Sequence, residues 1–164
     1  MMFVEAKRSF QKSKSYLLNI IKEPGNLSYY HPFCKRNDVI KWPGPNSIDE
    51  LEYLNGLTLE RNFFNWHENG YDLIIGMKNK SKMAQVNWLI EGNDEISSLR
   101  VRINPEIHHY TPFKSKFMQN LSWYLFVRPM LQRYINNVIK GFEYFVNTET
   151  QVKPNQFGKH SWFS

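Results

Sequence analysis

The amino-acid sequence predicts an α+β domain in which a curved antiparallel sheet of about seven strands wraps around a long C-terminal helix. Residues 38–103 contain successive strand-like segments joined by short turns, which favours an antiparallel meander over a parallel sheet. Residues 113–149 have the apolar spacing of a helix instead. A long amphipathic helix needs an apolar surface to pack on, and one face of the sheet is the surface that this chain offers.

The composition fits one domain with a single apolar core. Of the 164 residues, 41% are hydrophobic and 16% aromatic, which excludes disorder over most of the chain. We expect one domain over residues 1–150 and a tail over residues 151–164 that docks on it through its aromatic side chains. Cys34 has no partner for an internal disulfide, so we expect a cytoplasmic protein. No segment has the length and hydropathy of a membrane span or of a signal peptide.

The formal net charge of +6 allows an acidic partner, although the basic residues are scattered along the chain. The spacings of zinc fingers, helix-turn-helix motifs and RNP motifs are not found, so we expect no nucleic-acid partner. An interaction module whose basic outer face meets an acidic protein stays open as an alternative function.

The N-terminal elements follow from turn and cap residues. Residues 1–10 can form an edge strand. Apolar residues in "SKSYLLNIIKEPG" recur at helical spacing until Pro24 and Gly25, which predicts a helix of about three turns. A second short helix is predicted for "NLSYYHP", with Asn26 as its N-cap.

The segment "DELEYLNGLTLERNFFNW" predicts a β-hairpin whose register can be worked out. A two-residue Asn-Gly turn would mix the apolar and polar faces of the two strands. A three-residue loop over residues 54–56, with Gly56 in the left-handed conformation, keeps both strands amphipathic in phase, so we prefer it. This register places Asp49 opposite Arg61 on the inner face of the sheet.

Three further strands are predicted for "YDLIIGM", "AQVNWLIEG" and "ISSLRVRI". Side-chain alternation directs Arg100 and Arg102 outward and one apolar set of each strand inward. The three inward sets are Tyr71, Leu73, Ile75 and Met77; Val86, Trp88 and Ile90; and Leu99, Val101 and Ile103.

The C-terminal helical region carries two apolar stripes. The first consists of Phe117, Leu121, Tyr124 and Leu125, and the second of Leu131, Ile135, Val138, Ile139, Phe142 and Phe145. Pro129 lies between them and is expected to kink or break the helix. Gly141 interrupts the second stripe at a cost of about 1 kcal/mol relative to alanine, which indicates close approach of the sheet or space for a ligand.

The order of these elements resembles the START-like or SRPBCC superfamily, whose fold is called helix-grip. The resemblance runs from "FVEAKRSF" to about Thr150 and is carried by "LNGLTLERNFFNW", "GYDLIIG", "VNWLIEG", "LRVRINPEI" and "RPMLQRYINNVIKGFEYFV". The superfamily includes plant pollen allergens, lipid-transfer domains and polyketide cyclases, and this chain is similar to its bacterial ligand-binding type. The resemblance implies an elongated apolar cavity between the sheet and the C-terminal helix that holds a hydrophobic small molecule.

The inner face of the sheet then becomes the wall of a ligand cavity. Tyrosines on the C-terminal helix join this wall because their hydroxyl groups can bond to a ligand. The candidate ligand-binding residues are Arg61, Tyr53, Phe63, Tyr71, Leu73, Trp88, Leu99, Val101, Tyr124 and Tyr134.

Arg61 has two interpretations that the sequence leaves open. A buried unpaired charge costs several kcal/mol, so the guanidinium needs a partner. Asp49 on the neighbouring strand is one candidate, in a purely structural ion pair. A carboxylate, phosphate or carbonyl of a ligand is the other, and a guanidinium has enough donors for both.

No metal ion or cofactor is expected. His108 and His109 point apart in an extended chain, and His67 lacks the second histidine of a helical zinc motif. His31 lies where the resembling fold opens to its cavity, but we prefer to interpret it as a surface histidine. Cys34 has no activating base beside it, and we expect an idle thiol. Nucleophile-elbow, phosphate-loop and dinucleotide motifs are not found.

The preferred function is therefore binding or carriage of a hydrophobic or amphipathic small molecule, such as a lipid, a polyketide or an isoprenoid-like compound. A polyketide cyclase or dehydratase that uses the same cavity is the alternative, and it requires at least two titratable groups to converge inside the cavity. The exposed edge of the first strand also leaves a homodimer open.

Overall fold

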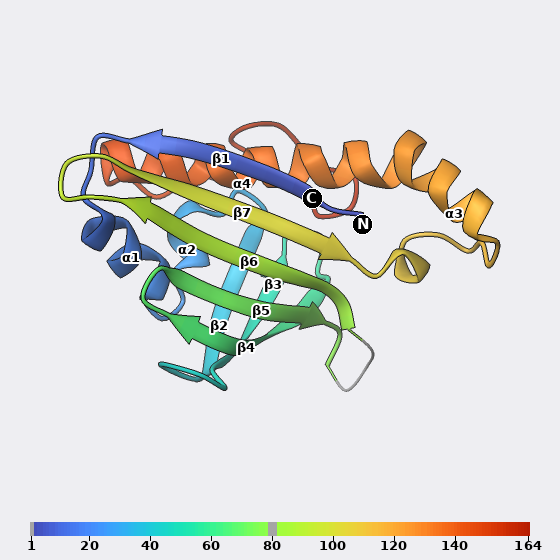
Figure 1. The fold of residues 1–164 in the computed structure, drawn as a ribbon, viewed down its shortest axis with the longest axis horizontal. Coiled ribbons are helices and arrows are strands. Elements are labelled where there is room, and N and C mark those ends of the chain that lie inside the picture. Colours follow the sequence, from blue (N-terminus) through green and yellow to red (C-terminus); the bar gives the residue numbers. More distant parts are fainter. Residues whose placement is uncertain (1, 79–81) are drawn as a thin grey trace.

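A computed structural model describes residues 2–78 and 82–164, and it has a seven-stranded antiparallel sheet with a long C-terminal helix across it (Figure 1). The strand order is β1-β7-β6-β5-β4-β3-β2, so β1 and β2 form the two edges. The elements are β1 (Val4–Phe10), α1 (Lys14–Lys22), α2 (Leu27–Tyr30), β2 (Cys34–Lys41), β3 (Ile48–Tyr53), β4 (Thr58–His67), β5 (Gly70–Gly76), β6 (Lys82–Gly92), β7 (Ser97–Pro105), η1 (Ile107–His109), α3 (Lys116–Ser122), η2 (Trp123–Val127) and α4 (Arg128–Thr148). The predicted α+β class and the two short helices after the first strand are confirmed.

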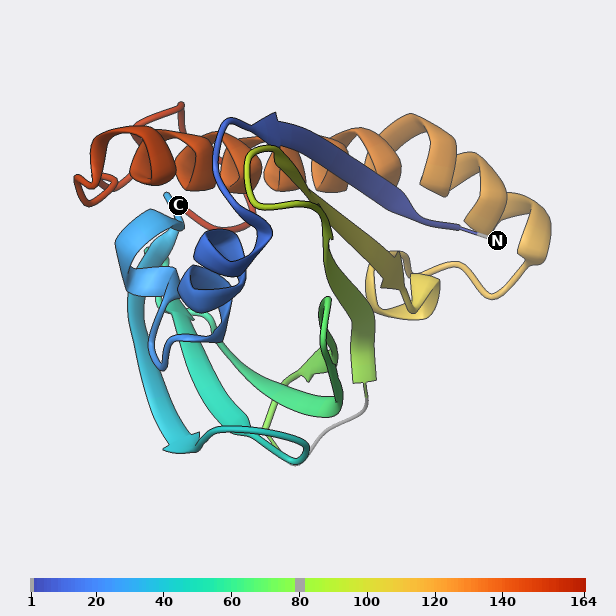
Figure 2. The same ribbon diagram turned by 60° about the vertical axis from the view of Figure 1, so that its left-hand side comes forward.

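The sheet bends around its own interior, and α4 crosses the open side (Figure 2). Register shifts interrupt the pairing of β2 with β3, of β4 with β5 and of β5 with β6. Irregularities of this kind increase the local twist of a strand and bend the sheet. The curvature explains how one sheet can face both short helices and α4.

The hairpin register predicted from the sequence is confirmed. Asp49 pairs with Arg61 across β3 and β4, and the backbone N–H of Tyr53 donates to the carbonyl of Leu57. Gly56 has a φ of +86°, the left-handed conformation that the three-residue loop requires. The loop geometry therefore brings both charged side chains to the inner face.

The inner faces of β5, β6 and β7 are those predicted by alternation, with one exception. Trp88 is 4% exposed and Val101 is fully buried, and their neighbours in the same sets are buried or partly buried. Met77 instead is 38% exposed, because β5 ends at Gly76 and the chain leaves the sheet there.

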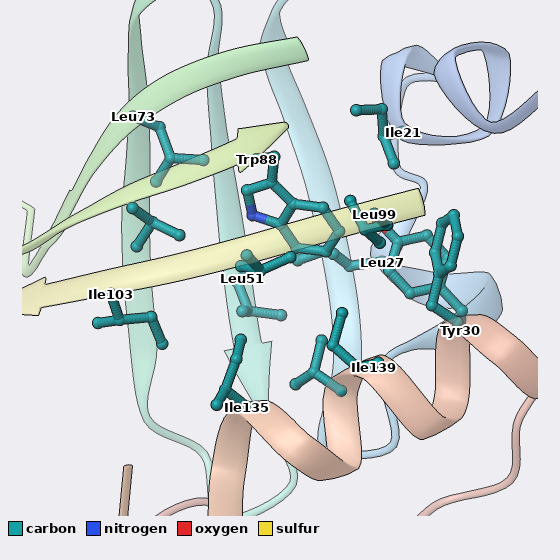
Figure 3. Packing of buried hydrophobic residues seen from close by; sticks show 14 of the residues in the cluster. Ile21, Leu27, Tyr30, Leu51, Leu73, Trp88, Leu99, Ile103, Ile135 and Ile139 are labelled. Carbon is teal, nitrogen blue, oxygen red and sulfur yellow. The ribbon is translucent and has the colours of Figure 1, made fainter. Parts of the chain in front are cut away.

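The apolar core lies between the sheet and the second half of the C-terminal helical region. Figure 3 shows Leu51, Leu73 and Trp88 of the sheet directed toward Ile135 and Ile139 of α4. The second apolar stripe of the sequence is thus buried, as predicted, except for Phe145, which is partly buried beside Tyr29 and Tyr30 of α2. Burial at about 25 cal/mol per Å² of apolar surface is the main stabilising contribution here.

The prediction that Pro129 kinks or breaks the helix is confirmed in part: the helical region does not break there, but α3 is inclined to α4 across the turn just before Pro129 (Figures 1 and 2). Helix α3 continues through the π-helical turn η2 into α4, with Pro129 in the first turn of α4. The wider π turn before Pro129 accommodates the proline ring and the missing backbone N–H within the continuing helix. The region from Lys116 to Thr148 is therefore continuously helical, with a bend at η2.

The reason why α4 has a glycine at position 141 differs from the two that the sequence indicated. A Cβ atom at this position would lie 2.0 Å from the carbonyl oxygen of Tyr30, in α2. The close approach is therefore that of a short helix, neither of the sheet nor of a ligand. Only glycine lets α2 and α4 pack at this distance.

Candidate ligand-binding site

An internal cavity of about 60 Å³ lies between the inner face of the sheet and the first half of α4. Its wall is mostly aliphatic and aromatic, and its polar members are concentrated next to α2 and in β3, β4 and α4. The lining residues are Leu27, His31, Leu51, Tyr53, Leu59, Arg61, Leu73, Ile75, Ala84, Val86, Trp88, Val101, Ile103, Tyr110, Leu131, Tyr134, Ile135, Val138 and Phe163. Pockets for drug-sized molecules have volumes of about 300–1,000 Å³, so this cavity accommodates a small group of atoms only.

The structure brings six of the ten sequence-predicted residues together in the cavity wall. These six are Tyr53, Arg61, Leu73, Trp88, Val101 and Tyr134. Phe63, Tyr71 and Leu99 are fully or almost fully buried in the core but do not line the cavity. Tyr124 lies outside, with 64% of its surface exposed, because η2 turns Trp123 and Val127 toward the domain instead.

Sequence reasoning missed two aromatic residues of the wall, Tyr110 and Phe163, and it interpreted His31 wrongly. His31 is only 5% exposed and lines the cavity, so the preferred interpretation as a surface histidine is wrong. It follows α2 directly, and the backbone N–H of Phe33 donates to its Nδ1 at 3.2 Å. The segment "HPF" therefore directs the imidazole of His31 inward. The signal in the sequence is the apolar Phe33 two positions later, which is buried together with His31.

Asp49 and Arg61 form a buried ion pair on the inner face. The Nε of Arg61 donates to Oδ1 of Asp49 at 2.6 Å, and Nη2 donates to Oδ2. The side chains of Arg61 and Asp49 are 4% and 0% exposed. Burial alone would lower the pKa of Arg61, but the charge and the hydrogen bonds of Asp49 raise it above its usual value. The guanidinium is therefore a fixed cation in the wall of the cavity.

Three polar side chains from different elements form one hydrogen-bonded chain. His31 Nε2 lies 2.9 Å from the hydroxyl of Tyr134, which lies 3.0 Å from the hydroxyl of Tyr53. Because His31 Nδ1 accepts a backbone N–H, a neutral imidazole carries its proton on Nε2 and donates it to Tyr134. One hydrogen bond joins the two tyrosine hydroxyls and uses one of their two hydrogens. The other hydrogen is left to donate to another acceptor.

Burial sets the protonation states of this chain. Burial, together with the positive charge of Arg61, lowers the pKa of His31 to about 3. Burial also raises the pKa values of Tyr53 and Tyr134 above their usual range. The three groups are therefore neutral at physiological pH, and they act as hydrogen-bond donors and acceptors rather than as ions.

The C-terminal residues cover one end of the cavity. The ring of Phe163 stacks on Tyr53, with centroids 4.5 Å apart, and lies 4.6 Å from the ring centroid of Tyr134. His160 anchors this segment, because its Nε2 lies 3.0 Å from the carbonyl oxygen of Met130 in α4. A surface groove of about 310 Å³ adjoins the cavity here and shares Leu59, Tyr110 and Phe163 with it.

Cys34 does not have the environment of a nucleophile. It is partly buried beside α2, and burial raises the pKa of its thiol to about 11. A thiol with this pKa carries almost no thiolate at neutral pH. Within residues 2–78 and 82–164, no group of three or more histidine, cysteine, aspartate or glutamate side chains is arranged to hold a metal ion.

No family model matches the sequence, and no curated protein matches it. Solved structures do match at the level of the fold. A START superfamily protein from Mycobacterium smegmatis aligns over 92% of this chain and 100% of its own, with a TM-score of 0.61 and 12% identity. The protein TTHA0849 from Thermus thermophilus aligns over 90% of this chain and 98% of its own, with a TM-score of 0.66 and 16% identity.

A third match is DynU16, a protein in the dynemicin biosynthetic locus. It aligns over 92% of this chain, with a TM-score of 0.64 and 10% identity, and this chain spans 49% of its length. Identities this low speak for the fold alone. The chain therefore has the START-like, helix-grip fold that the order of its elements predicts.

Proposed function

We propose that the protein binds one hydrophobic or amphipathic small molecule, such as a lipid, a polyketide or an isoprenoid-like compound, with one end of it in the cavity. The observation that carries this proposal is an apolar cavity with tyrosine hydroxyls in its wall. Apolar walls supply affinity by removing apolar surface from water, and a few fixed polar groups orient the guest.

The hydroxyl pair favours a guest that carries an oxygen acceptor, such as a carbonyl. Tyr53 and Tyr134 have one hydroxyl hydrogen more than their mutual contact uses. A buried donor without an acceptor is unfavourable by about 1–3 kcal/mol, so a guest that supplies the acceptor gains this free energy. A fully apolar guest of the same shape gains only the free energy of burying its apolar surface.

The length of the guest depends on Phe163. The cavity of about 60 Å³ holds only the oxygen-bearing end of a lipid or polyketide. The adjoining groove of about 310 Å³ offers an apolar path for the remainder. Because Phe163 lines both spaces, its ring must turn away for one molecule to occupy both.

A cavity-filling substitution tests this proposal. The Ala84→Leu variant adds three carbon atoms at a lining position that is 1% exposed. We expect this variant to lose binding of anilinonaphthalene sulfonate and of fluorescent fatty acids, measured by titration, and to yield no ligand-bound species in native mass spectrometry. Ala6→Leu makes the same change on β1, outside the cavity wall, and should bind like the wild type. Equal binding by all three proteins, or no binding by the wild type, would contradict the proposal.

A cyclase or dehydratase is the second candidate, and one observation favours it. His31, Tyr53 and Tyr134 converge in the cavity, and their donors would stabilise the oxyanion of a ring-closing carbonyl addition. Such a reaction also needs a base, however, and His31 Nδ1 already accepts the N–H of Phe33. We therefore favour carriage. Turnover of a short aromatic poly-ketone that is lost in Tyr134→Phe would reverse this preference.

A further inference from the structure

The segment from Phe113 to Phe126, which contains α3 and most of η2, has an apolar side that the described part of the chain leaves exposed. Helix α3 and η2 extend past the end of the sheet, next to Phe3 and the start of β1 (Figures 1 and 2). Trp123 and Val127 face the domain and are 3% and 1% exposed. The other side, which we call the apolar patch, holds six large side chains that are 41–73% exposed: Phe113, Phe117, Leu121, Tyr124, Leu125 and Phe126.

The apolar patch is more than scattered surface hydrophobicity. Single exposed apolar side chains are ordinary, whereas a contiguous group on one element marks an interaction site. Phe117, Leu121, Tyr124 and Leu125 recur at the spacing of one helix face, and a stripe with this spacing is ordinarily covered by another surface. The structure leaves this stripe uncovered, while the stripe of α4 is buried.

Along the chain the charges next to the apolar patch are all positive, and in space one carboxylate, Glu5 of β1, lies beside Tyr124 and Arg128. Residues 107–142 contain no aspartate or glutamate, and their basic side chains are Lys114, Lys116, Arg128, Arg133 and Lys140. Lys114, Lys116 and Arg128 are exposed and flank the apolar patch directly. Aromatic and leucine side chains beside lysine and arginine are typical of helices that lie in the interface of an anionic bilayer.

We propose that the apolar patch docks on an anionic membrane surface, with its aromatic side chains among the lipid headgroups and the flanking basic residues against lipid phosphates. This docking does not depend on the guest of the cavity. Among the helices that the structure describes, none is long and apolar enough to cross a membrane, so the segment would lie along the surface. A second copy of the chain is a poorer partner, because a two-fold interface would bring two identical basic segments together.

Co-sedimentation with vesicles tests the docking. We expect the full chain to bind vesicles of equal parts phosphatidylcholine and phosphatidylglycerol, and to bind pure phosphatidylcholine vesicles far more weakly. Added salt should weaken the binding by screening the charges. The double variant Phe117→Ser/Leu125→Ser should bind about tenfold or more weakly, because two side chains no longer enter the interface. Lys114→Glu/Lys116→Glu should lose the preference for anionic lipid.

Two matched variants keep the test specific. Ile96→Ser removes an apolar side chain that is 48% exposed on the far β6–β7 turn, and it should bind like the wild type. Lys41→Glu/Lys153→Glu changes the net charge as much as the Lys114/Lys116 variant does, but at exposed positions in β2 and the C-terminal tail, and should bind nearly normally. Failure of the wild type to bind anionic vesicles, or equal loss in the matched variants, overturns the proposal. So does a dimer in light scattering that Phe117→Ser/Leu125→Ser dissociates.

Discussion

Both carboxylate oxygens of Asp49 accept hydrogen bonds from the guanidinium of Arg61, on adjacent strands and out of contact with water. The sequence left Arg61 with two interpretations, and the structure supports the structural one. The pair uses Nε and Nη2, and Arg61 still lines the cavity. The positive charge of the wall is therefore largely neutralised before any guest arrives.

Removing one member of this pair should be far more harmful than removing both. Asp49→Leu leaves a buried, unpaired guanidinium, and we expect a loss of about 3–5 kcal/mol in the free energy of unfolding. The double variant Asp49→Leu/Arg61→Met replaces both charges by apolar groups and should recover most of this loss. Urea unfolding of the wild type, both single variants and the double variant measures the coupling. Additive losses would contradict a buried pair that acts as a unit.

Stability should fall in mild acid because of His31. The folded state holds the pKa of this imidazole at about 3, against 6.5 for the unperturbed group, so the unfolded state binds the proton more readily. Stability is therefore full above the unfolded pKa and falls as the pH decreases, by up to about 1.4 kcal/mol per pH unit. Urea unfolding between pH ~6.5 and ~5.3 measures this slope, while the carboxylates stay largely ionised.

The matched test of this slope uses His31→Gln and His108→Gln. The first variant should flatten the pH dependence, and the second should not, because His108 is exposed. The pKa of His160 is also lowered by burial, so the contribution of His160 to the slope should remain in both variants. An unchanged slope in His31→Gln would show that His31 titrates normally in the folded protein.

The two cavity tyrosines should differ in their effect on stability. Tyr134→Phe removes the acceptor of His31 Nε2 and the partner of Tyr53, and should cost about 1–3 kcal/mol. Tyr53→Phe leaves the contact between His31 and Tyr134 in place, and should cost about 1 kcal/mol or less. Tyr124→Phe changes an exposed side chain and serves as the control for thermal unfolding. A larger loss of stability in Tyr53→Phe than in Tyr134→Phe would contradict the order of hydrogen-bond donors and acceptors assigned to His31, Tyr134 and Tyr53.

The ring of Phe163 covers one end of the cavity, and we expect it to weaken the binding of a probe. Phe163→Ala removes a ring that is 8% exposed, and we expect a loss of about 3–5 kcal/mol in stability. The same variant should bind anilinonaphthalene sulfonate more tightly, because the cavity and the groove become continuous. Phe157→Ala in the same tail, whose ring faces Tyr144, is the control and should not change probe binding. Weaker probe binding in a folded Phe163→Ala protein would mean that the ring is part of the binding surface.

Gly141→Ala should destabilise the protein although alanine is the better helix former. The propensity gain is about 1 kcal/mol. The added Cβ, however, would lie 2.0 Å from the Tyr30 carbonyl oxygen, and overpacking of this kind costs about 1–3 kcal/mol or more. Thermal unfolding should show a lower Tm for Gly141→Ala and little change for Asn147→Ala, at an exposed position of the same helix. A higher Tm in Gly141→Ala would mean that α2 moves away at no cost.

Local signals in the sequence were sufficient for the fold and for the charged pair. The alternation of β4 and the glycine of its turn place Asp49 opposite Arg61 without any knowledge of the rest of the chain. His31 and Phe163 needed long-range information, because their burial depends on how α2 and the tail meet α4. Tyr124 was assigned to the cavity because the sequence does not reveal that α3 and η2 extend past the end of the sheet, where the stripe of Tyr124 stays exposed.

The contact between Gly141 and Tyr30 also decides where the interior can dilate. It clamps the second half of α4, whereas the cavity lies under the first half, at Leu131, Tyr134 and Ile135. Because the packing is tightest at Gly141, we expect the gap between sheet and helix to widen more easily toward the C-terminal tail. If the proposed guest binds, we therefore expect it to enter from the tail side, and we expect the site to tolerate guests of different length but not a bulkier inner end near α2.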